Sequence, residues 1–273
     1  MDPPETFTAF ERRRWQQAAK EYARVFSPLT SQAIEPLLNA TKVAAGTRVL
    51  EVACGSGDLA ATALDRGAQV AAIDFSEEMV EIARNRHPEL DVRSGEAESL
   101  QFADHTFEAV IMAFLLGHLA DPDRALAEAH RVLAGGGRFA TVWWSDVDRA
   151  EALGLLMKAV SEHGRTDVQL PAALPFDHFS DPAALGGALR SAGFAEVRVV
   201  EVRMTWRLRS GEALFEAYAR GTARNAALLE AQTPEAFVEI RAAVVANARR
   251  FKTPAGDLEI PMPVWLGSGV REG

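Results

Sequence analysis

From residue 47 to residue 145, short and continuously apolar runs alternate with helical stretches. The apolar runs lie at 49–53, 70–73, 90–92, 110–114 and 139–144. The helical stretches between them lie at 58–65, 77–86 and 124–133. Short strands that are apolar at every position are typical of a parallel sheet, because helices cover both of its faces. The sequence therefore predicts an α/β fold with a doubly wound, mostly parallel sheet.

The remainder of the chain predicts helices at both ends of this core. Trp15, Ala18, Tyr22 and Val25 recur at helical spacing, and a second short helix follows at 34–38. Beyond residue 145 we expect helices at 149–160, 181–193, after 210 and at 233–251, with strands at 197–208 and 258–265. The chain thus divides into N-terminal helices at 1–45, a core at 46–145 and, at 146–273, the rest of the sheet with a helical insertion before the last strand. We expect these parts to form a single structural domain.

Composition narrows the functional class. The 273 residues carry a net charge of −9, which argues against nucleic-acid binding through phosphates. Cys54 is the only cysteine, which excludes a disulfide framework and a zinc site of paired thiolates. No apolar run reaches the roughly 18–20 residues of a membrane span, and the polar stretch from Met1 to Arg14 lacks the apolar region of a signal peptide. We therefore expect a cytoplasmic enzyme that acts on a small molecule.

A glycine-rich turn between the first strand and its helix is the strongest chemical signal. Gly55 and Gly57 let the backbone approach a ligand closely, and the helix that follows offers unpaired N–H groups. Seventeen residues beyond Gly57, Asp74 ends the second strand, where a carboxylate can accept both hydroxyls of a ribose. Together these features predict a cofactor that carries a nucleoside.

Two kinds of nucleoside cofactor fit this turn. Gly55-x-Gly57-x-x-Ala60 satisfies the dinucleotide fingerprint, in which a pyrophosphate lies at the helix N-terminus. Glu51, however, lies four residues before the first glycine, and its carboxylate would repel a pyrophosphate. The same carboxylate suits a cationic amino-acid group. A nucleoside cofactor that carries such a group is therefore favoured over a dinucleotide.

At this point the sequence resembles the class I S-adenosylmethionine-dependent methyltransferases, in the methyltransferase type 11 and quinone-biosynthesis branch. Residues 49–60, with Glu51-Val52-Ala53-Cys54-Gly55-Ser56-Gly57, are similar to the first motif of that family. The second to fifth motifs resemble 72–79, 94–102, 107–122 and 131–137. The resemblance covers 45–145 and implies a seven-stranded Rossmann-like sheet. It also implies that 1–45 forms a lid, that 46–145 binds S-adenosylmethionine, and that the insertion in 146–273 covers the substrate.

The first two motifs imply residues for the methionine and ribose parts of the cofactor. Ala53, Gly55 and Gly57 would line the methionine part, with Glu51 close to its ammonium group. Asp74 would accept hydrogen bonds from the ribose hydroxyls.

The adenine would be bound through the second and third motifs. The resemblance implies that Phe75 and Met79 flank the ring. Glu96 would accept from the adenine amino group, and the backbone N–H of Ala97 would donate to the ring. The family more often has Asp where this chain has Glu96, whose longer side chain can make the same bond in a different geometry.

The fourth motif implies residues close to the transferred methyl group. Ala113 and Phe114 would lie near the sulfonium, with His118 just beyond them. Tyr22 resembles the lid aromatic that closes over the cofactor. A sulfonium methyl is already electrophilic, so rate comes mainly from alignment and from the exclusion of water. An oxygen or nitrogen acceptor also needs a base, for which His118 is the candidate.

Candidates for the acceptor pocket come from the second half of the chain. Neighbouring strand residues point to opposite faces, so one of Trp143 and Trp144 belongs to the core while Trp144 or the adjacent Ser145 can line the pocket. His163 and His178 lie in the region that would wall this pocket. Asp146 and Asp148 are explained by a solvated turn, and we expect no metal.

Two alternatives to a methyltransferase stay open. The first is an NAD(P)-dependent oxidoreductase, which would need a Tyr and a Lys at helical spacing for proton transfer. No lysine lies within 20 residues of Tyr218, which counts against this alternative. The second is a module that binds S-adenosylmethionine without catalysis. The sequence leaves open the acceptor, the choice between carbon, oxygen and nitrogen methylation, and the oligomeric state, with a homodimer as one alternative.

Overall fold

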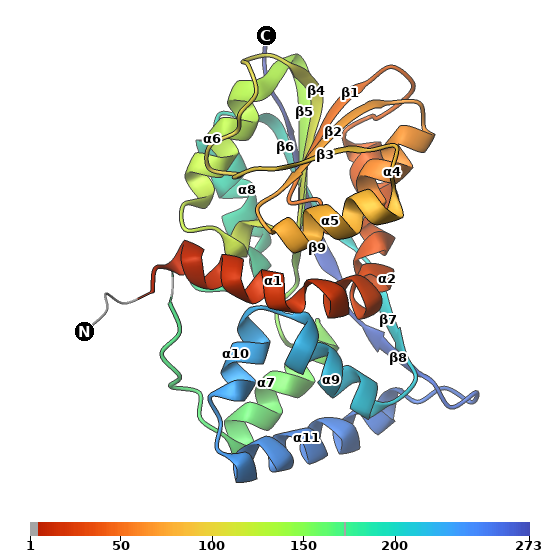
Figure 1. Ribbon diagram of the computed structural model, residues 1–273, viewed down its shortest axis with the longest axis vertical. Coiled ribbons are helices and arrows are strands. Elements are labelled where there is room, and N and C mark those ends of the chain that lie inside the picture. The colour runs from red at the N-terminus through yellow and green to blue at the C-terminus, as the bar shows by residue number, and fades with distance from the viewer. Residues whose placement is uncertain (1–4, 172) are drawn as a thin grey trace. The chain divides into compact units, whose positions relative to one another are not determined.

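The computed structural model describes residues 5–171 and 173–273, and these residues group into two compact units (Figure 1). Unit 1 gathers the described residues within 1–29, 145–172 and 203–263. Unit 2 gathers those within 30–144, 173–202 and 264–273. The predicted division of the chain at residues 45 and 145 stays a prediction. The first four residues of its N-terminal part lie outside the described part of the chain.

Unit 2 is built on a seven-stranded sheet in the order β3-β2-β1-β4-β5-β9-β6. Its strands are β1 (Arg48–Val52), β2 (Gln69–Asp74), β3 (Asp91–Ser94), β4 (Phe107–Ala113), β5 (Leu133–Trp144), β6 (Ala195–Val202) and β9 (Val264–Val270). The pairings from β3 to β5 are parallel, and β9 alone runs antiparallel to both of its neighbours. This arrangement confirms the predicted doubly wound, mostly parallel sheet.

Helices cover both faces of this sheet, with α4 and α5 on one side and α6 and α8 on the other (Figure 1). The helices of unit 2 are α3 (Ile34–Ala40), α4 (Asp58–Asp65), α5 (Glu77–Arg86), α6 (Pro122–Val132) and α8 (Pro182–Ser191), with 3-10 turns η1 (Ser31–Ala33), η2 (Leu116–His118) and η3 (His178–Ser180). Side-chain caps fix where they begin: the Asp121 carboxylate accepts from Arg124 N at 3.0 Å, and Ser76 Oγ accepts from Met79 N at 3.4 Å. Because both faces are covered, most residues of the central strands are apolar and buried, and Val110 is fully buried.

Strand order creates a switch point at the centre of this sheet. The chain leaves β1 toward β2 and β3, then returns to β4 on the other side of β1. Open α/β sheets bind ligands outside the carboxyl ends of the strands at such a point. The residues that follow β1, β2 and β4 therefore lie where a ligand is expected.

Unit 1 is mainly helical. Its elements are α1 (Phe7–Val25), α7 (Glu151–His163), α9 (Gly211–Gly221), α10 (Arg224–Glu230), α11 (Pro234–Ala248), η4 (Arg249–Phe251) and the strands β7 (Thr205–Leu208) and β8 (Leu258–Pro261); α2 (Ser27–Thr30) ends at its border with unit 2. The α9 helix packs against α1, α10 and α11 and is the centre of this unit. In the described part of the chain, no helix combines the length and the apolar character that crossing a bilayer demands.

Three predictions about the elements in the second half of the chain were wrong. The predicted strand at 197–208 is two strands, β6 in the large sheet and β7 in a two-stranded sheet with β8. The predicted strand at 258–265 is likewise β8 and β9, divided at Met262 and Pro263. Both pairs keep an alternating pattern across the break, so periodicity cannot reveal that the chain changes sheets. Three helices, α9 to α11, occupy the stretch where two were predicted.

Candidate active site

The turn after β1 has an unusual backbone. Ala53, Gly55 and Gly57 have φ angles of 60°, 54° and 82°, in the left-handed region. At Gly57 a Cβ atom would lie 3.2 Å from the Cβ of Ala83 and 3.3 Å from the ring of His87. Glycine is therefore required there for both conformation and space. The turn leads directly into α4, whose first N–H groups lie at its end.

Two buried carboxylates hold this turn in place. Asp74, the last residue of β2, accepts from Gly55 N through Oδ2 and from Ser76 N through Oδ1, each at 2.9 Å. Glu51 in β1 accepts from Ala60 N through Oε2 at 2.8 Å. Glu51 is 3% exposed and Asp74 is 5% exposed. The predicted glycine turn and its two acids are thus brought together in one place.

Burial makes both carboxylates weak acids. Desolvation, with the nearby charges of Asp58 and Asp74, raises the pKa of Glu51 to about 8. Desolvation, with the charge of Glu96, raises the pKa of Asp74 to about 6, although backbone N–H donors oppose the shift. Neighbouring acids thus add to the desolvation, so a bound cation would relieve an electrostatic cost at this site.

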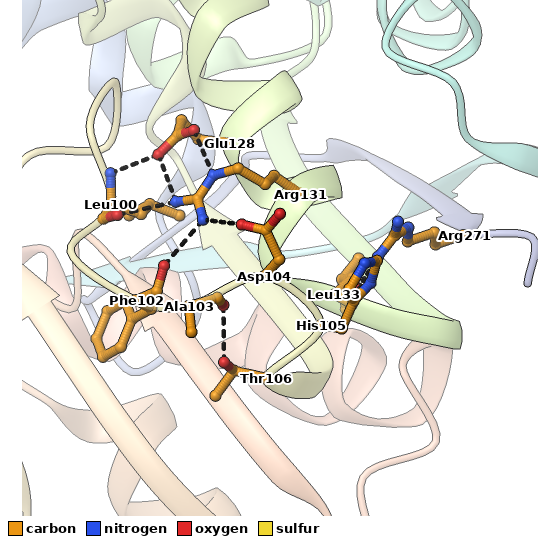
Figure 2. Close-up of polar contacts among 10 residues, drawn as sticks. All are labelled: Leu100, Phe102, Ala103, Asp104, His105, Thr106, Glu128, Arg131, Leu133 and Arg271. Atoms are coloured by element: carbon orange, nitrogen blue, oxygen red, sulfur yellow. Dashed lines mark hydrogen bonds and ion pairs between the residues drawn. The ribbon is translucent and has the colours of Figure 1, made fainter.

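The loop between β3 and β4 carries Glu96 and Ala97 and is fastened by α6. Figure 2 shows Arg131 reaching from α6 into this loop, where its guanidinium donates to the carbonyls of Leu100 and Phe102, both at 2.9 Å. It also pairs with Asp104 at 2.6 Å and with Glu128 at 2.7 Å, and Glu128 accepts from Leu100 N at 2.8 Å (Figure 2). Glu96 itself is half-buried, and Ala97 is buried.

An aromatic pair lies at the carboxyl ends of β4 and β5. Phe114 follows β4 with a φ of 56°, a conformation that is strained for a bulky residue. Its ring lies 4.5 Å from the ring of Trp144, with 35° between the planes. Both rings are half-buried, and Ala113 beside Phe114 is also half-buried. Strain of this kind persists where surrounding structure enforces it, and it gathers at functional sites.

His118 lies in η2, held between aromatic rings. Its ring centroid is 5.6 Å from that of Trp143 and 5.2 Å from that of Phe176. Trp143 Nε1 donates to the backbone carbonyl of Phe176 at 3.2 Å, which joins the indole to the backbone of that residue. At Gly117 a Cβ atom would come within 2.2 Å of the Trp143 ring, so only glycine permits this packing.

The remaining predicted residues are spread over both units. In unit 2, Phe75 is half-buried and Met79 is buried at the start of α5, while His178 lies in η3 with its ring 4.9 Å from that of Phe179. In unit 1, Tyr22 stacks on Phe26 at 5.6 Å and 5°.

Ser145 and His163, the other two predicted site residues in unit 1, have different surroundings. Ser145 is 1% exposed, and its Oγ has no hydrogen-bond partner among the described residues. His163 is exposed at the end of α7, with Nδ1 3.7 Å from a carboxylate oxygen of Glu239. The predicted place of Tyr22 beside the cofactor, and those of Ser145 and His163 in the acceptor pocket, stay predictions.

Sequence reasoning gave no role to Arg131 or Phe176. Arg131 is the first residue of the stretch that resembles the fifth motif, and its spacing of three residues from Glu128 on one helix is a usable signal for an ion pair. Phe176 lies 33 residues from the Trp143 that it contacts, in a stretch without periodicity, so no local pattern could identify it.

Comparison with known proteins agrees with this geometry. Residues 50–141 match a family model described as a methyltransferase domain. Among solved structures, the chain is similar to Haemonchus contortus phosphoethanolamine N-methyltransferase 2 in complex with S-adenosyl-L-methionine. That match has a TM-score of 0.60 and 18% identity over 99% of this chain and 61% of the other. A Bacillus subtilis protein, YcgJ, matches with a TM-score of 0.55 and 18% identity over 89% of this chain and 99% of that one. At these identities the structural matches show the fold alone.

The relatives found by sequence show the family as well as the fold. A demethylmenaquinone methyltransferase of Renibacterium salmoninarum is 38% identical over 40% of this chain, which spans 46% of that relative's length. A ubiquinone/menaquinone biosynthesis C-methyltransferase of Rhodopseudomonas palustris is 34% identical over 59% of this chain and 74% of its own length. With the glycine turn, its two acids and the sheet order in place, the chain belongs to the class I S-adenosylmethionine-dependent methyltransferases, in the branch of the quinone-biosynthesis enzymes.

Proposed function

We propose that this chain moves a methyl group from S-adenosylmethionine to a small, quinone-like ring by in-line displacement, without a metal. The observation that carries this proposal is the pair of buried carboxylates, Glu51 and Asp74, around a turn whose backbone is left-handed at three positions. The printed names of the sequence relatives supply the quinone-like class of acceptor.

The residues present fit the cofactor in charge and in shape. S-adenosylmethionine carries an ammonium and a sulfonium cation, and buried carboxylates with raised pKa values are the complement of such charges. Gly55 and Gly57 adopt their left-handed backbone without strain and carry no side chain that could crowd a ligand at the turn. We assign the methionine part to Ala53, Gly55 and Gly57, with Glu51 beside the ammonium.

Asp74 is assigned to the ribose hydroxyls. A carboxylate has about four lone-pair sites, so Asp74 can keep its bonds from the backbone N–H groups of Gly55, Ser76 and Phe75 and still accept from a ribose hydroxyl. Phe75 and Met79 would flank the adenine. Glu96 and Ala97 would bind its edge, from a loop that Arg131 fastens.

The bound cofactor supplies an electrophilic methyl group, and the chain's task is to align the acceptor and exclude water. Ala113 and Phe114 are assigned to the sulfonium end. His118, held between Trp143 and Phe176, is assigned as the base that takes the proton from the acceptor. A base in this fixed position needs no reorganisation during the reaction.

The acceptor contacts are assigned to Trp144, Ser145, His163 and His178. Trp144 is the best supported, because its ring and that of Phe114 present half-buried aromatic surface at the carboxyl edge of the sheet. Flat aromatic surface suits a planar ring. The proposed lid, with Tyr22, would close over the cofactor.

A ligand titration tests the cofactor assignment. We expect S-adenosylhomocysteine to raise the melting temperature of the protein and NADH to leave it unchanged. Asp74→Asn should abolish the shift with S-adenosylhomocysteine, whereas Asp65→Asn, the same change at an exposed position at the end of α4, should preserve it. A shift with NADH alone would overturn the proposal.

A transfer assay tests the reaction. The protein is incubated with S-adenosylmethionine and 1,4-naphthoquinol, and mass spectrometry detects methylated ring and S-adenosylhomocysteine in equal amounts. His118→Asn should lower kcat more than KM. Formation of neither product, with the cofactor bound, would leave a binding module in place of an enzyme.

A further inference from the structure

The ring of His87 lies against the glycine turn that follows β1. His87 comes directly after α5, where its backbone N–H donates to the Ala83 carbonyl at 2.8 Å. A Cβ atom at Gly57 would lie 3.3 Å from Cδ2 of His87 and 3.4 Å from the Leu90 side chain. Ala83 and Leu90 are buried, and the His87 side chain is 23% exposed. The turn is therefore held by contacts with the end of α5 as well as by the two buried carboxylates.

A chain of hydrogen bonds connects His87 to the centre of this turn. His87 Nε2 lies 3.4 Å from Oδ1 of Asp58, the first residue of α4. A carboxylate only accepts hydrogen bonds, so Nε2 carries the proton and donates. The second oxygen of Asp58, Oδ2, accepts from Ser56 Oγ at 2.6 Å. Ser56 is 4% exposed and lies between the two left-handed glycines, so the chain reaches from the end of α5 into the turn.

Other charged groups lie near this chain but at longer distances. Arg86 Nη1 is 3.7 Å from Asp58 Oδ2, and Nδ1 of His87 is 3.9 Å from a carboxylate oxygen of Glu89. Both distances exceed that of a hydrogen bond, and the Arg86 and Glu89 side chains are exposed, so solvent screens both pairs. Gly57, which precedes α4, offers no side chain to cap the helix. The orientation of the Asp58 carboxylate therefore depends mainly on His87 and Ser56.

We propose that His87 is a positioning residue for the cofactor. It holds Asp58, and through Asp58 it holds Ser56, so that the turn keeps the left-handed backbone assigned to the methionine part of S-adenosylmethionine. Glycine permits many backbone conformations, so a turn without this bond spends less time in the competent one. Affinity falls by the same factor as the competent fraction. The inference rests on the proposed function in that the turn binds the methionine part.

His87→Phe tests the proposal, because it keeps a ring beside Gly57 and removes the donor. Its dissociation constant for S-adenosylhomocysteine, measured by calorimetric titration, should rise about fivefold. Methylthioadenosine has the nucleoside without the amino-acid part, so its dissociation constant should change by less than about twofold. His87→Gln restores an N–H donor and should bind S-adenosylhomocysteine within about twofold of wild type. A merely structural role would change the affinities for both ligands together.

His130→Phe is the matched control. His130 also packs against a left-handed glycine of unit 2: its Nε2 is 3.4 Å from where a Cβ atom of Gly193 would lie, and the φ of Gly193 is 92°. Gly193 precedes β6 and so lies at the amino edge of the sheet, whereas the glycine turn follows β1 at the carboxyl edge. This change should leave both dissociation constants as they are in wild type.

A double-mutant cycle shows whether His87 acts through Asp58. Ser56→Ala removes the other end of the chain, so the double variant with His87→Phe should bind S-adenosylhomocysteine no more weakly than the weaker single variant. Should His87→Phe fail to fold, Ser56→Ala carries the same test, with the same difference between the two ligands.

Four results would overturn the inference: additive losses in the cycle, wild-type affinity in His87→Phe, equal losses for both ligands, or no rescue by His87→Gln. The cofactor assignment is judged separately, on the wild-type protein. Absence of S-adenosylhomocysteine binding by wild type defeats that assignment and this inference with it, whereas binding that His87→Phe leaves intact defeats the inference alone.

Discussion

Glu51 is a buried acid whose pKa is strongly raised. It is an acid in the middle of a parallel sheet, 3% exposed, with one hydrogen bond to Ala60 N and with Asp58 and Asp74 nearby. Its pKa of about 8 means that the ligand-free protein holds Glu51 protonated through neutral pH. Pairing with an ammonium group requires the carboxylate, so binding and ionisation are coupled at this residue.

The coupling predicts a pH-dependent cofactor affinity. Affinity for S-adenosylhomocysteine should fall by up to about tenfold for each pH unit below 8, because the proton competes with the ligand's ammonium group for Glu51. Glu51→Gln can keep the bond from Ala60 N but has no charge, so its affinity should be lower at pH 8 and lack this dependence. Calorimetric titration from pH 6 to 9 of both proteins measures the difference, in which titration of the ligand itself cancels. Parallel pH profiles would contradict the assignment.

The raised pKa of Glu51 also makes the unfolding free energy depend on pH. Glu51 binds its proton more tightly when folded, so its contribution to the unfolding free energy is fully present below the ordinary pKa of 4.5 and is lost as pH rises through about 8. Without ligand, Glu51→Gln should therefore be more stable than wild type at pH 9, and the gap should close toward pH 5. Urea denaturation at both pH values provides this check.

At the scale of elements, one side chain of α6 binds the loop between β3 and β4. The loop between β3 and β4 carries Glu96 and Ala97, yet its backbone carbonyls at Leu100 and Phe102 are bound by one side chain, Arg131. Arg131 therefore links the geometry of a helix on one face of the sheet to the edge that would recognise adenine (Figure 2).

Arg131→Met should release this loop. Loss of the charge-assisted bonds to two carbonyls and two carboxylates should lower the unfolding free energy by about 2 kcal/mol. Affinity for S-adenosylhomocysteine should fall several-fold, while binding of methionine alone should be unaffected. Arg93→Met in β3 is the control, because Arg93 pairs only on the surface with Asp91 and its loss should change neither quantity measurably. An unchanged affinity in Arg131→Met would show that the loop keeps its shape without the anchor.

At the scale of the whole molecule, each unit is assembled from stretches that lie far apart in the sequence. In unit 1, Arg224 donates to Glu11 and to the Pro171 carbonyl, both at 3.0 Å, and so joins three separate stretches of chain. Glu11 is fully buried, and the Arg224 side chain is 17% exposed. Arg14 repeats the connection from α1 to α10 through Glu230 at 2.8 Å.

Glu11→Gln tests how much this junction contributes. Removal of one charge from a buried pair leaves Arg224 poorly compensated, so the unfolding free energy should fall by about 3 kcal/mol. Glu5→Gln removes the partner of Arg13 on the same helix, but at an exposed position, and should cost far less. Urea denaturation of the two variants under one condition gives the comparison. Equal costs would mean that burial adds nothing to this pair.

Local patterns predicted the parts of the protein that local physics decides. Continuously apolar strands indicated the parallel sheet, and Gly55 and Gly57 indicated the turn after its first strand, which the structure shows to be left-handed at both positions. The burial of Trp143 beside a half-buried Trp144 followed from strand alternation. The strand breaks near Met204 and Met262 did not follow, because alternation is the same whichever sheet a strand joins.

The sequence by itself determined the fold class, the glycine turn with its acids, and the cofactor family, because each depends on residues within about one strand–turn–helix unit of one another. Only the tertiary structure decided that Arg131 binds the loop that carries Glu96, that the Phe176 ring packs against His118, and that the buried Tyr218 hydroxyl has no hydrogen-bond partner among the described residues. These features depend on contacts between residues tens to hundreds of positions apart. Which side chains meet at such distances is set by packing of the whole unit, and no periodicity along the chain encodes it.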